Sequence, residues 1–580
     1  MKLDQALLYA HTIRRLLPVQ IAAQVSQKLR GFRPAPAAEQ APPFPGWRRR
    51  PQRPLLAARG ADFNPVSSLR RARWNFLNEE RVGTSANRWQ VGETSKLWLY
   101  NLQYHEWIWS LEPEEAAAMV EDWMQTHPAD VSTDAWEPYV ISLRLQNWVG
   151  YFSERGFAAL ENQGFRERWW RCIYQQAECL RRNLEVHLQA NHLLENAIAL
   201  TMVAAAFDGA WAKGLWESAW PLLEEELDRQ FLSDGMHYER SPLYQARLLY
   251  ALAQTEAFLD EGRQSILRAR LQAGARALRC LSHGDGEIAL FNDSACGIAH
   301  TPRVLLGHLE REELIDNRRL DGGWALPAAG YFGFCHQGLN LIADLGSFAP
   351  RHQPGHAHAD FGSFELSVGS TRIVTDTGVH HYLPNASRTY DRSVAAHNTV
   401  EVEGLRQIEL WSAFRAAREG KVTHQIEQAD ERGLRVRGEL VSYAERGQTY
   451  RHTRAWDCDA SGRIAWEDTL QASCTLSATT RLHLAPQVGF RDAVDGAIWQ
   501  HPAEIEFHSA LPRNVVWEVG ASVYHPAFQQ EEARSMLVGR AQVGPHASHW
   551  RHELQLRAAP TGGWHANCQP KALASSPSLV

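Results

Sequence analysis

Apolar positions between about residues 100 and 285 recur at the three- and four-residue spacing of helices that face a core. Short connections separate these segments and carry helix breakers such as His127-Pro128 and Asp234-Gly235. The spacing predicts helices over residues 116–124, 139–152, 169–184, 192–207, 216–232, 244–258 and 266–281. Consecutive helices with short connections are typical of a helical toroid or solenoid, although no clean sequence repeat is visible.

The pattern changes near Gly322-Gly323, where short, alternating, β-branched runs replace the helical spacing. Strands are predicted at residues 339–344, 363–368, 371–376, 399–403, 434–441 and 464–467. Closely spaced turn residues between such runs are typical of an antiparallel β-sandwich. We therefore expect a helical domain over residues 61–325 and a β-sandwich over 326–580, with the change of character between 320 and 330.

Residues 1–60 form a separate region, with an amphipathic helix near the N-terminus followed by an extended segment rich in Pro, Ala and Arg. Asp4, His11, Arg14 and Arg15 interrupt any apolar run long enough for a signal-peptide core. No segment approaches the roughly 20 apolar residues that span a bilayer. The simplest interpretation is a cytoplasmic protein, with export to the periplasm by another route as the alternative.

Composition narrows the class of partner. A net charge of −6 over 580 residues gives no support for a nucleic-acid partner, which favours a clustered basic surface, but a local basic cleft still permits an anionic ligand. Most of the 22 Trp and 15 Tyr are expected to fill cores, although flat aromatic rings also stack on sugars. The eight cysteines are scattered without a CxxC pair, which favours reduced thiols.

The run Gly355–Leu366 carries the densest candidate chemistry. If it is a strand, His356 and His358 point to one face, because side chains two residues apart share a side. Asp376 and His397 follow downstream, and two imidazoles with one carboxylate suit zinc. The alternative is a pair of surface histidines on an edge strand.

Two helix starts offer further polar side chains. Asn191-His192 opens an apolar helix, where Asn191 is either an N-cap or an amide donor to a substrate carboxylate, with His192 beside it. Tyr244 begins another helix after Ser241-Pro242, with Tyr238 as its competitor. A tyrosine in such a place is either a packing residue or a catalytic one.

The chain resembles the heparinase II/III-like polysaccharide lyases. The resemblance rests on AWEPY at 135–139 with SLRLQNW at 142–148, ANHLLEN at 190–196, DG at 234–235 with ERSPLY at 239–244, HAHAD at 356–360 and HNTV at 397–400. It covers residues from about 70 to 404, and matches only in character beyond. The resemblance implies an α+β multidomain protein, with an N-terminal (α/α) toroid followed by a C-terminal antiparallel β-sandwich.

The resemblance also implies β-elimination on a uronic-acid polysaccharide, which removes the C5 proton, breaks the 4-O bond and leaves a 4,5-unsaturated uronate. Asn191 would neutralise the carboxylate, with His192 assisting or acting as base. Tyr244 would be the acid towards the leaving oxygen, and also the base where the two groups are syn. His356 would be the opposing base or a donor to the carboxylate.

The remaining expected roles concern substrate and metal. The substrate-binding candidates in the shared motifs are Arg144, Asn147, Trp148, Glu239 and Arg240, and Arg240 would also favour a tyrosinate at position 244. The resemblance further implies a structural zinc ion held by His358, Asp376 and His397, which leaves His356 for the substrate. Gln245 stands where many relatives have His.

Two other functions stay open. A glycoside hydrolase or phosphorylase would need a pair of carboxylates, for which Glu137, Asp234 and Glu239 are available. A non-catalytic glycan-binding or exopolysaccharide-biosynthesis accessory protein would keep the fold alone. The expected partner is an anionic polysaccharide or oligosaccharide, and a homodimer is possible.

Overall fold

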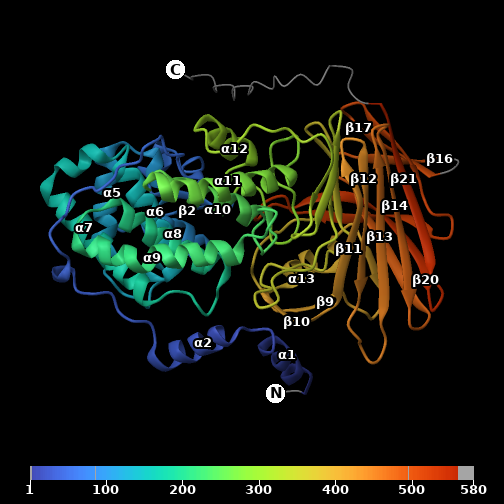
Figure 1. Ribbon diagram of the computed structural model, residues 1–580, viewed down its shortest axis with the longest axis horizontal. Coiled ribbons are helices and arrows are strands. Elements are labelled where there is room, and N and C mark those ends of the chain that lie inside the picture. The colour runs from blue at the N-terminus through green and yellow to red at the C-terminus, as the bar shows by residue number, and fades with distance from the viewer. Residues whose placement is uncertain (1–2, 85, 494–495, 559–580) are drawn as a thin grey trace.

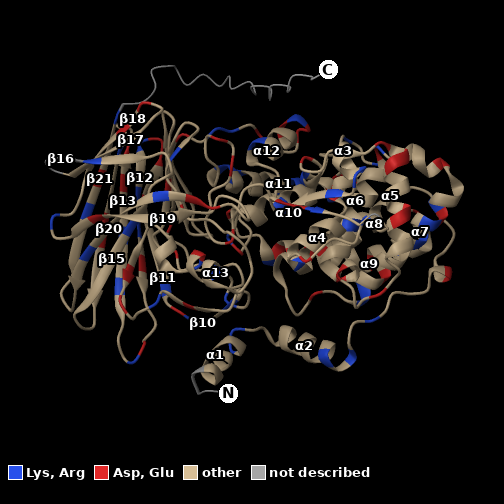
Figure 2. Cartoon of the chain, turned by 180° about the vertical axis from the view of Figure 1, so that it is seen from behind, with Lys and Arg blue, Asp and Glu red and all other residues tan. Residues whose placement is uncertain are grey.

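The computed structural model describes residues 3–84, 86–493 and 496–558. A helical domain and a β-domain lie side by side, and the two N-terminal helices run beneath both (Figure 1). Lysine, arginine, aspartate and glutamate are interspersed over both domains (Figure 2). The seven cysteines in the described ranges are free thiols, and Cys568 lies outside those ranges.

The helical domain forms where the apolar spacing predicts it. Its helices are α3 (Val66–Leu69), α4 (Lys96–Tyr104), α5 (Pro113–Thr126), α6 (Pro138–Ser153), α7 (Gln163–Arg182), α8 (Ala190–Ala206), α9 (Gly209–Gln230), α10 (Pro242–Glu256), α11 (Glu261–Cys280) and α12 (Pro302–Arg311). A small hairpin of β1 (Arg73–Phe76) and β2 (Glu79–Val82) packs at its start. The seven predicted helices correspond to α5 through α11, and the predicted toroid followed by a β-sandwich is confirmed.

Burial distinguishes the helices of this domain. Every residue of α6 is buried, and α8 is buried apart from His192, whereas α7 and α11 bury one face and expose charged side chains on the other. Tryptophans fill this core, including Trp98, Trp123, Trp148 and Trp169, none of which has exposed surface. These tryptophans therefore serve in core packing, which is the commoner role expected of them.

Antiparallel pairing organises the β-domain. One sheet of five strands runs in chain order: β3 (Gly322–Leu326), β4 (Tyr331–His336), β5 (Leu339–Asp344), β6 (Phe364–Val368) and β7 (Thr371–Val374). An eight-stranded sheet has the order β11 (Lys421–Asp430), β12 (Gly433–Val441), β13 (Tyr450–Asp459), β14 (Arg463–Ala472), β21 (Ser548–Ala558), β18 (Ile505–Ala510), β17 (Gly496–His501) and β16 (Gly489–Ala493). A four-stranded sheet has the order β19 (Val516–Tyr524), β20 (Glu532–Val543), β15 (Leu476–His483) and β8 (Val400–Val402).

The described part of the β-domain also contains the hairpin β9 (Ile408–Trp411) and β10 (Arg415–Glu419), and the short helix α13 (Ala386–Asp391). The change from helices to strands occurs within the predicted interval, because β3 begins at Gly322. The predicted division at 325/326 is therefore slightly late and cuts through this strand. The shift follows from pairing, since Gly322 and Gly323 are in register with Cys335 and Phe334 of β4.

An apolar cluster joins the two domains. Met236, Leu281 and Phe291 of the helical domain are buried with Trp324 and Tyr331 of the first sheet. Burial of apolar surface on both sides fixes the relative position of the domains. The candidate motifs meet at this junction, and their residues are therefore positioned by both domains.

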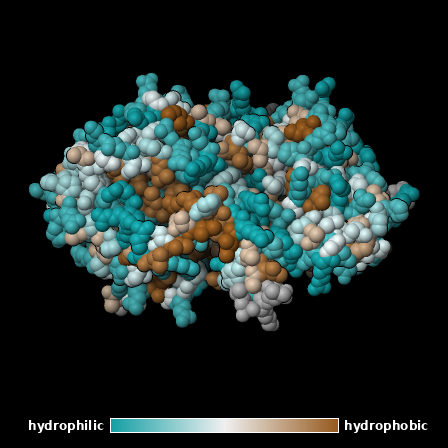
Figure 3. Space-filling model, turned by 60° about the horizontal axis from the view of Figure 1, so that its bottom comes forward, coloured by the Kyte–Doolittle hydropathy of each residue, from teal (hydrophilic) through white to brown (hydrophobic). Residues whose placement is uncertain are grey.

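The N-terminal region is a strap across both domains, with two helices where one was predicted: α1 (Leu3–Ile13) and α2 (Pro18–Arg30). Arg15 donates to the carbonyl oxygens of Arg351 and Ala417 in the β-domain. Trp170 of α7 donates to the carbonyl of Pro42 farther along the strap. Apolar side chains gather in a stripe on the face that carries these helices (Figure 3). None of the helices in the described ranges has the length and apolar character needed to cross a bilayer.

Candidate active site

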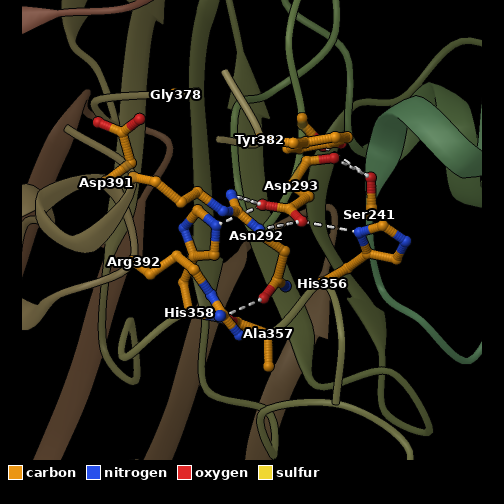
Figure 4. Close-up of polar contacts among 12 residues, drawn as sticks. Ser241, Asn292, Asp293, His356, Ala357, His358, Gly378, Tyr382, Asp391 and Arg392 are labelled. Carbon is orange, nitrogen blue, oxygen red and sulfur yellow. Dashed lines mark hydrogen bonds and ion pairs between the residues drawn. The ribbon is translucent and has the colours of Figure 1, made fainter. Parts of the chain in front are cut away.

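The carboxylate of Asp293 is the centre of the polar contacts at the domain junction. Asp293 lies in the loop between α11 and α12, and its side chain has no exposed surface. His356 donates through Nδ1 to one carboxylate oxygen at 2.7 Å, and His358 donates through Nε2 to the other at 2.8 Å. The two imidazoles reach this carboxylate from different sides (Figure 4).

Arg388 of α13 completes the contacts of Asp293 with a two-pronged ion pair, one prong of which measures 2.7 Å. Burial alone would raise the pKa of Asp293, but the charge of Arg388 and the hydrogen bonds from both histidines hold it well below its usual range. Asp293 is therefore an ionised carboxylate with both oxygens occupied. It orients other groups and is not free to act as an acid or base.

The His-Ala-His run is a loop, and the expectation of a strand there is wrong. Strand β6 begins only at Phe364, after the loop has passed the domain junction. His356 and His358 nevertheless contact the same side chain, the carboxylate of Asp293. The alternative of exposed histidines on an edge strand is excluded, since both are buried.

Tyr244 lies in the first turn of α10, beside His356. Ser241 caps this helix by accepting the backbone N–H of Tyr244, and its hydroxyl donates to the carbonyl of Asp293 at 2.8 Å. The rings of Tyr244 and His356 have centroids 4.3 Å apart, and the Tyr244 hydroxyl is 3.5 Å from that of Tyr382. Burial, followed by the neighbouring tyrosines, raises the pKa of Tyr244 well above 10, so its phenol is protonated.

Asn191 stands in the first turn of α8 and contacts Glu239. Its backbone N–H and its side-chain amide both donate to Glu239 Oε2, at 3.2 and 2.8 Å. The carboxylate thus caps the N-terminus of α8, where a negative charge is favoured. Asn191 is not the N-cap, because α8 begins at Ala190 and Gln189 holds the cap position. Gln189 and Ala190 have φ values of 62° and 53°. Such left-handed backbone at two residues in succession is strained and points to a constrained site.

Glu239 links the Asn191 side of the junction to the His356 side. Its Oε1 atom lies 3.7 Å from His356 Nε2 and has no hydrogen-bond partner in the described part of the chain. The structure therefore brings four predicted residues together in one continuous set of contacts. They are Asn191, Glu239, His356 and Tyr244.

His192 lies at the edge of this group, with about a third of its side chain exposed. Its Nδ1 contacts Glu185 Oε1 at 3.0 Å, and its ring packs on Tyr139 with centroids 4.4 Å apart. Burial alone would lower the pKa of His192, but the charge and hydrogen bond of Glu185, together with other carboxylates, raise it. The cationic form of His192 is therefore favoured.

Arg240 contacts the β-domain through both its side chain and its backbone. Its guanidinium donates to Ser347 of the β-domain, and its carbonyl accepts the Tyr331 hydroxyl at 2.7 Å. The pKa of Tyr244 is raised, not lowered, so no tyrosinate is favoured in the free protein. Arg240 ties the two domains together next to Glu239.

Arg144, Asn147 and Trp148 lie inside the helical core, which argues against the prediction that they bind substrate. Arg144 has no exposed surface, lies over the ring of Trp123 and donates to Gln176 Oε1 at 2.7 Å. Its burial lowers its pKa to about 9. Trp148 donates to His105 Nδ1 at 2.9 Å. The side-chain amide of Asn147 donates to the backbone carbonyls of Tyr104 and Leu143. A helix that is buried on all sides, as α6 is, gives no alternation of polar and apolar faces. The sequence therefore could not distinguish these buried polar side chains from a binding motif.

Two family models match the chain. The heparinase II/III N-terminus matches residues 71–269, and the heparinase II/III-like C-terminal domain matches residues 318–551. Together they span most of the sequence, and Asp293 lies in the stretch between the two matched ranges. The chain belongs to the heparinase II/III-like family.

Solved structures of this family share the fold. A heparinase III structure superposes with a TM-score of 0.64 at 15% identity, covering 93% of this chain and 90% of that one. A heparan sulfate lyase from Pedobacter heparinus gives a TM-score of 0.57 at 13% identity, covering 93% and 88%. At these low identities the superpositions establish the shared fold alone. The roles of individual residues have to be argued from the local geometry.

Two curated proteins are similar in sequence. Heparin-sulfate lyase of Pedobacter heparinus is 23% identical over 355 residues, which is 55% of this chain and 52% of that protein. FtsZ-localized protein C of Caulobacter vibrioides is 23% identical over 346 residues, which is 58% of this chain and 57% of that protein. The chain thus spans about half the length of the curated relatives that it matches.

The zinc ion implied by the resemblance to heparinase II/III-like lyases can be tested against the donor atoms. His358 Nδ1, His397 Nε2 and Asp360 Oδ2 are buried and have no hydrogen-bond partner among the residues that the structure describes, and such atoms are candidate ligands. However, the Asp376 carboxylate accepts from His397 Nδ1 at 2.8 Å, and His358 Nε2 is bound to Asp293. Among the described residues, no group of three or more His, Cys, Asp or Glu side chains is arranged to hold a metal ion. The metal set therefore stays a prediction: the rings of His358 and His397 are neighbours with centroids 5.3 Å apart, while the Asp376 carboxylate is already bonded to His397.

Sequence reasoning missed the residues that orient the histidines and tyrosine of this heparinase II/III-like site. They are Asp293, Arg388, Tyr382 and Glu185. One sequence signal was available for Asp293, since Asn292-Asp293-Ser294 is a polar run directly after the apolar Ile288–Phe291. Nothing in the spacing, however, indicated that this run meets the His-Ala-His loop.

We expect Trp148→Phe to lower the free energy of unfolding by about 1–3 kcal/mol, because it leaves the buried His105 Nδ1 without its donor. Urea unfolding followed by circular dichroism measures this loss. Trp216→Phe is the matched control, since this half-buried tryptophan on α9 makes no such bond, and a change below about 0.5 kcal/mol is expected. Unchanged stability with loss of glycan binding would return Trp148 to the substrate-binding set.

Proposed function

We propose that this protein is a polysaccharide lyase that cleaves a uronic-acid-containing glycan by β-elimination and leaves a 4,5-unsaturated uronate end. The observation that carries the proposal is the contact of Tyr244 with His356 across the domain junction, with Asn191 connected to them through Glu239. A phenol, an imidazole and an amide are the groups that this reaction needs. Membership of the heparinase II/III-like family supports the same assignment.

The chemistry requires a base for the weakly acidic C5 proton and an acid for the leaving 4-O oxygen. His356 suits the role of base better than Tyr244 does in this geometry. Its Nδ1 donates to Asp293, which leaves Nε2 to accept a proton. Asp293 fixes the orientation and tautomer of this imidazole, as a carboxylate does for a histidine base. The ion pair with Arg388 keeps Asp293 charged throughout.

Tyr244 is the matching acid. Its raised pKa keeps the phenol protonated until the leaving oxygen develops negative charge. The tilted packing against His356 places acid and base next to each other at the junction of the two domains. This arrangement favours a division of roles between His356 and Tyr244 over a single tyrosine acting as both base and acid.

Asn191 and His192 are proposed to neutralise the uronate carboxylate. Asn191 gives one amide hydrogen to Glu239 and retains another for a ligand. His192 is favoured as a cation by Glu185 and is partly exposed, so it can meet an anionic group. Neutralising the carboxylate acidifies the C5 proton and stabilises the enolate-like intermediate.

A hydrolase is less well supported, because the candidate carboxylates are engaged elsewhere. Glu137 pairs with Lys96 at 2.7 Å, Asp234 accepts the backbone N–H of Ala329 at 2.8 Å, and Glu239 holds Asn191. Inverting and retaining hydrolases need two carboxyl groups at a separation of roughly 5–10 Å across the bond. The non-catalytic alternative keeps the fold without the reaction, and the activity of the variants below separates it from a lyase.

Tyr244→Phe is expected to lower kcat by about 10²–10⁴-fold, the usual contribution of a positioned acid or base. The measurement is the rise in ultraviolet absorbance of the unsaturated product across a panel of uronate polysaccharides. Tyr250→Phe, which removes a hydroxyl bonded to the Leu56 carbonyl away from His356, should retain activity. Full activity of Tyr244→Phe would remove the proposed acid. New reducing ends without the absorbance rise would indicate hydrolysis.

The pH dependence of KM should report His192. Its folded pKa is raised, so the cation is present below the ordinary value near 6.5 and is lost as pH rises through the folded pKa. KM for a uronate substrate is therefore expected to increase on that alkaline side. His192→Gln should have a higher KM that no longer changes over this pH interval. A wild-type KM that stays flat there would show that His192 does not pair with the carboxylate.

Zinc remains a proposal that rests on the unpaired buried nitrogens of His358 and His397. An ion held by these side chains would order the loop next to His356 without reacting. We expect near-stoichiometric zinc in the purified wild type by elemental analysis and its loss in His358→Ala, with a lower unfolding temperature in both the chelated protein and the variant. His381→Ala is the matched buried control and should keep its zinc. Metal-free wild type of full stability would end the proposal.

A further inference from the structure

The strap exposes an apolar stripe to solvent. Its side chains recur every four residues along α1, α2 and their connection: Ile13, Leu17, Ile21, Val25 and Leu29. Val25 is 51% exposed and Leu29 is 81% exposed. Single exposed apolar residues are ordinary, but a contiguous stripe marks an interaction surface. Figure 3 shows the stripe on the underside of the molecule.

Helix α2 is turned with its polar side towards the protein. Gln20 is its one buried residue, and its side-chain amide lies within hydrogen-bonding distance of the carbonyls of His187 and His352. Gln24 and Gln27 are half-buried, while Ile21 and Val25 face outwards. A surface helix normally directs its apolar side to the core. The reversed orientation of α2 indicates that its apolar side is suited to an apolar partner outside the protein.

This orientation is held by specific contacts. Arg15, between the two helices, is buried and bonds the carbonyls of Arg351 and Ala417 as well as the Glu419 carboxylate. The ring of Tyr9 packs edge-on against Trp411 with centroids 5.0 Å apart. The β-domain thus fixes the strap with its apolar stripe outwards.

The charge of the strap defines the partner. Residues 1–60 contain 11 Lys and Arg against 2 Asp and Glu, a net charge of +9, so the other 520 residues carry −15. No acidic residue occurs between Asp4 and Glu39. The exposed cations beside the stripe are Arg14, Lys28, Arg30 and Arg33. Apolar side chains flanked by cations are typical of helices that lie in the surface of an anionic bilayer.

The geometry points to the stripe on α1 and α2 as a docking surface for a lipid bilayer that exposes anionic headgroups. The stripe inserts among the upper acyl chains, and the flanking lysine and arginine side chains pair with headgroup phosphates. A second copy of this chain fits the surface less well, because a two-fold interface would bring the same cations together. The anionic bilayer matches both the apolar and the charged part of the strap.

Docking would set the position of the active site. The Gln20 side chain contacts the segment just before Asn191 and the segment just before His356, so the strap borders the junction that holds both residues. A bound bilayer would therefore lie beside this junction and favour glycans close to the membrane surface. The docking itself does not rest on the proposed lyase activity.

Co-sedimentation of the full chain with vesicles tests the inference. The probes are phosphatidylcholine vesicles with and without phosphatidylglycerol, at low and high salt. We expect binding to the anionic vesicles that weakens with salt, as screened headgroup contacts require. The combined variant Ile21→Gln, Val25→Gln and Leu29→Gln should bind at least about tenfold more weakly, since it removes the inserted side chains but keeps good helix formers.

The matched control is Val516→Gln with Val519→Gln, which removes two exposed apolar side chains from β19 in the β-domain and should bind as wild type. Lys28→Glu with Arg30→Glu should lose the preference for anionic vesicles. Light scattering after gel filtration records the oligomeric state in parallel. Absence of wild-type binding, or binding that survives the triple substitution, would overturn the inference. A dimer that the triple substitution dissociates, without vesicle binding, would overturn it in favour of a second copy.

Discussion

The carboxylate of Asp293 is the constraint on which the arrangement at the domain junction depends. It is buried away from water, and an unpaired charge in that position would strongly lower the free energy of unfolding. Arg388 and two histidines compensate it, and all three come from the β-domain while Asp293 comes from the helical domain. One buried charge therefore fixes the orientation of three side chains and the distance between two domains.

The contacts of Asp293 extend to the proposed base and then to the proposed acid. His356 is oriented by Asp293, Tyr244 packs against His356, and Ser241 ties the start of α10 to the same loop through the Asp293 carbonyl. The apolar cluster around Phe291 holds this loop against the first sheet. The helical domain thus supplies the proposed acid and the carboxylate-binding side chains, and the β-domain supplies the proposed base. Neither domain contains the arrangement by itself.

The strap adds a second relation between the domains. It crosses from β10 to α7, and Gln20 contacts both segments that lead into the candidate site. A bilayer on its outer face and a glycan at the junction would then be neighbours. Helix α2 and the candidate site are therefore neighbours, because both lie along the junction between the two domains.

The sequence by itself determined the alternation of helices and strands, the order of the family motifs and the identity of Asn191, Tyr244 and His356 as chemically capable residues. Local periodicity encodes which face of an element is buried, and this information is present in short windows. Only the tertiary structure decided the partners. His356 and His358 share Asp293, which lies 63 and 65 positions earlier, while Asp376 binds His397. Arg144 and Trp148 proved to be core residues because α6 is enclosed on every side. Spacing along a chain carries no distance between segments that far apart, and their contacts arise only when both domains pack.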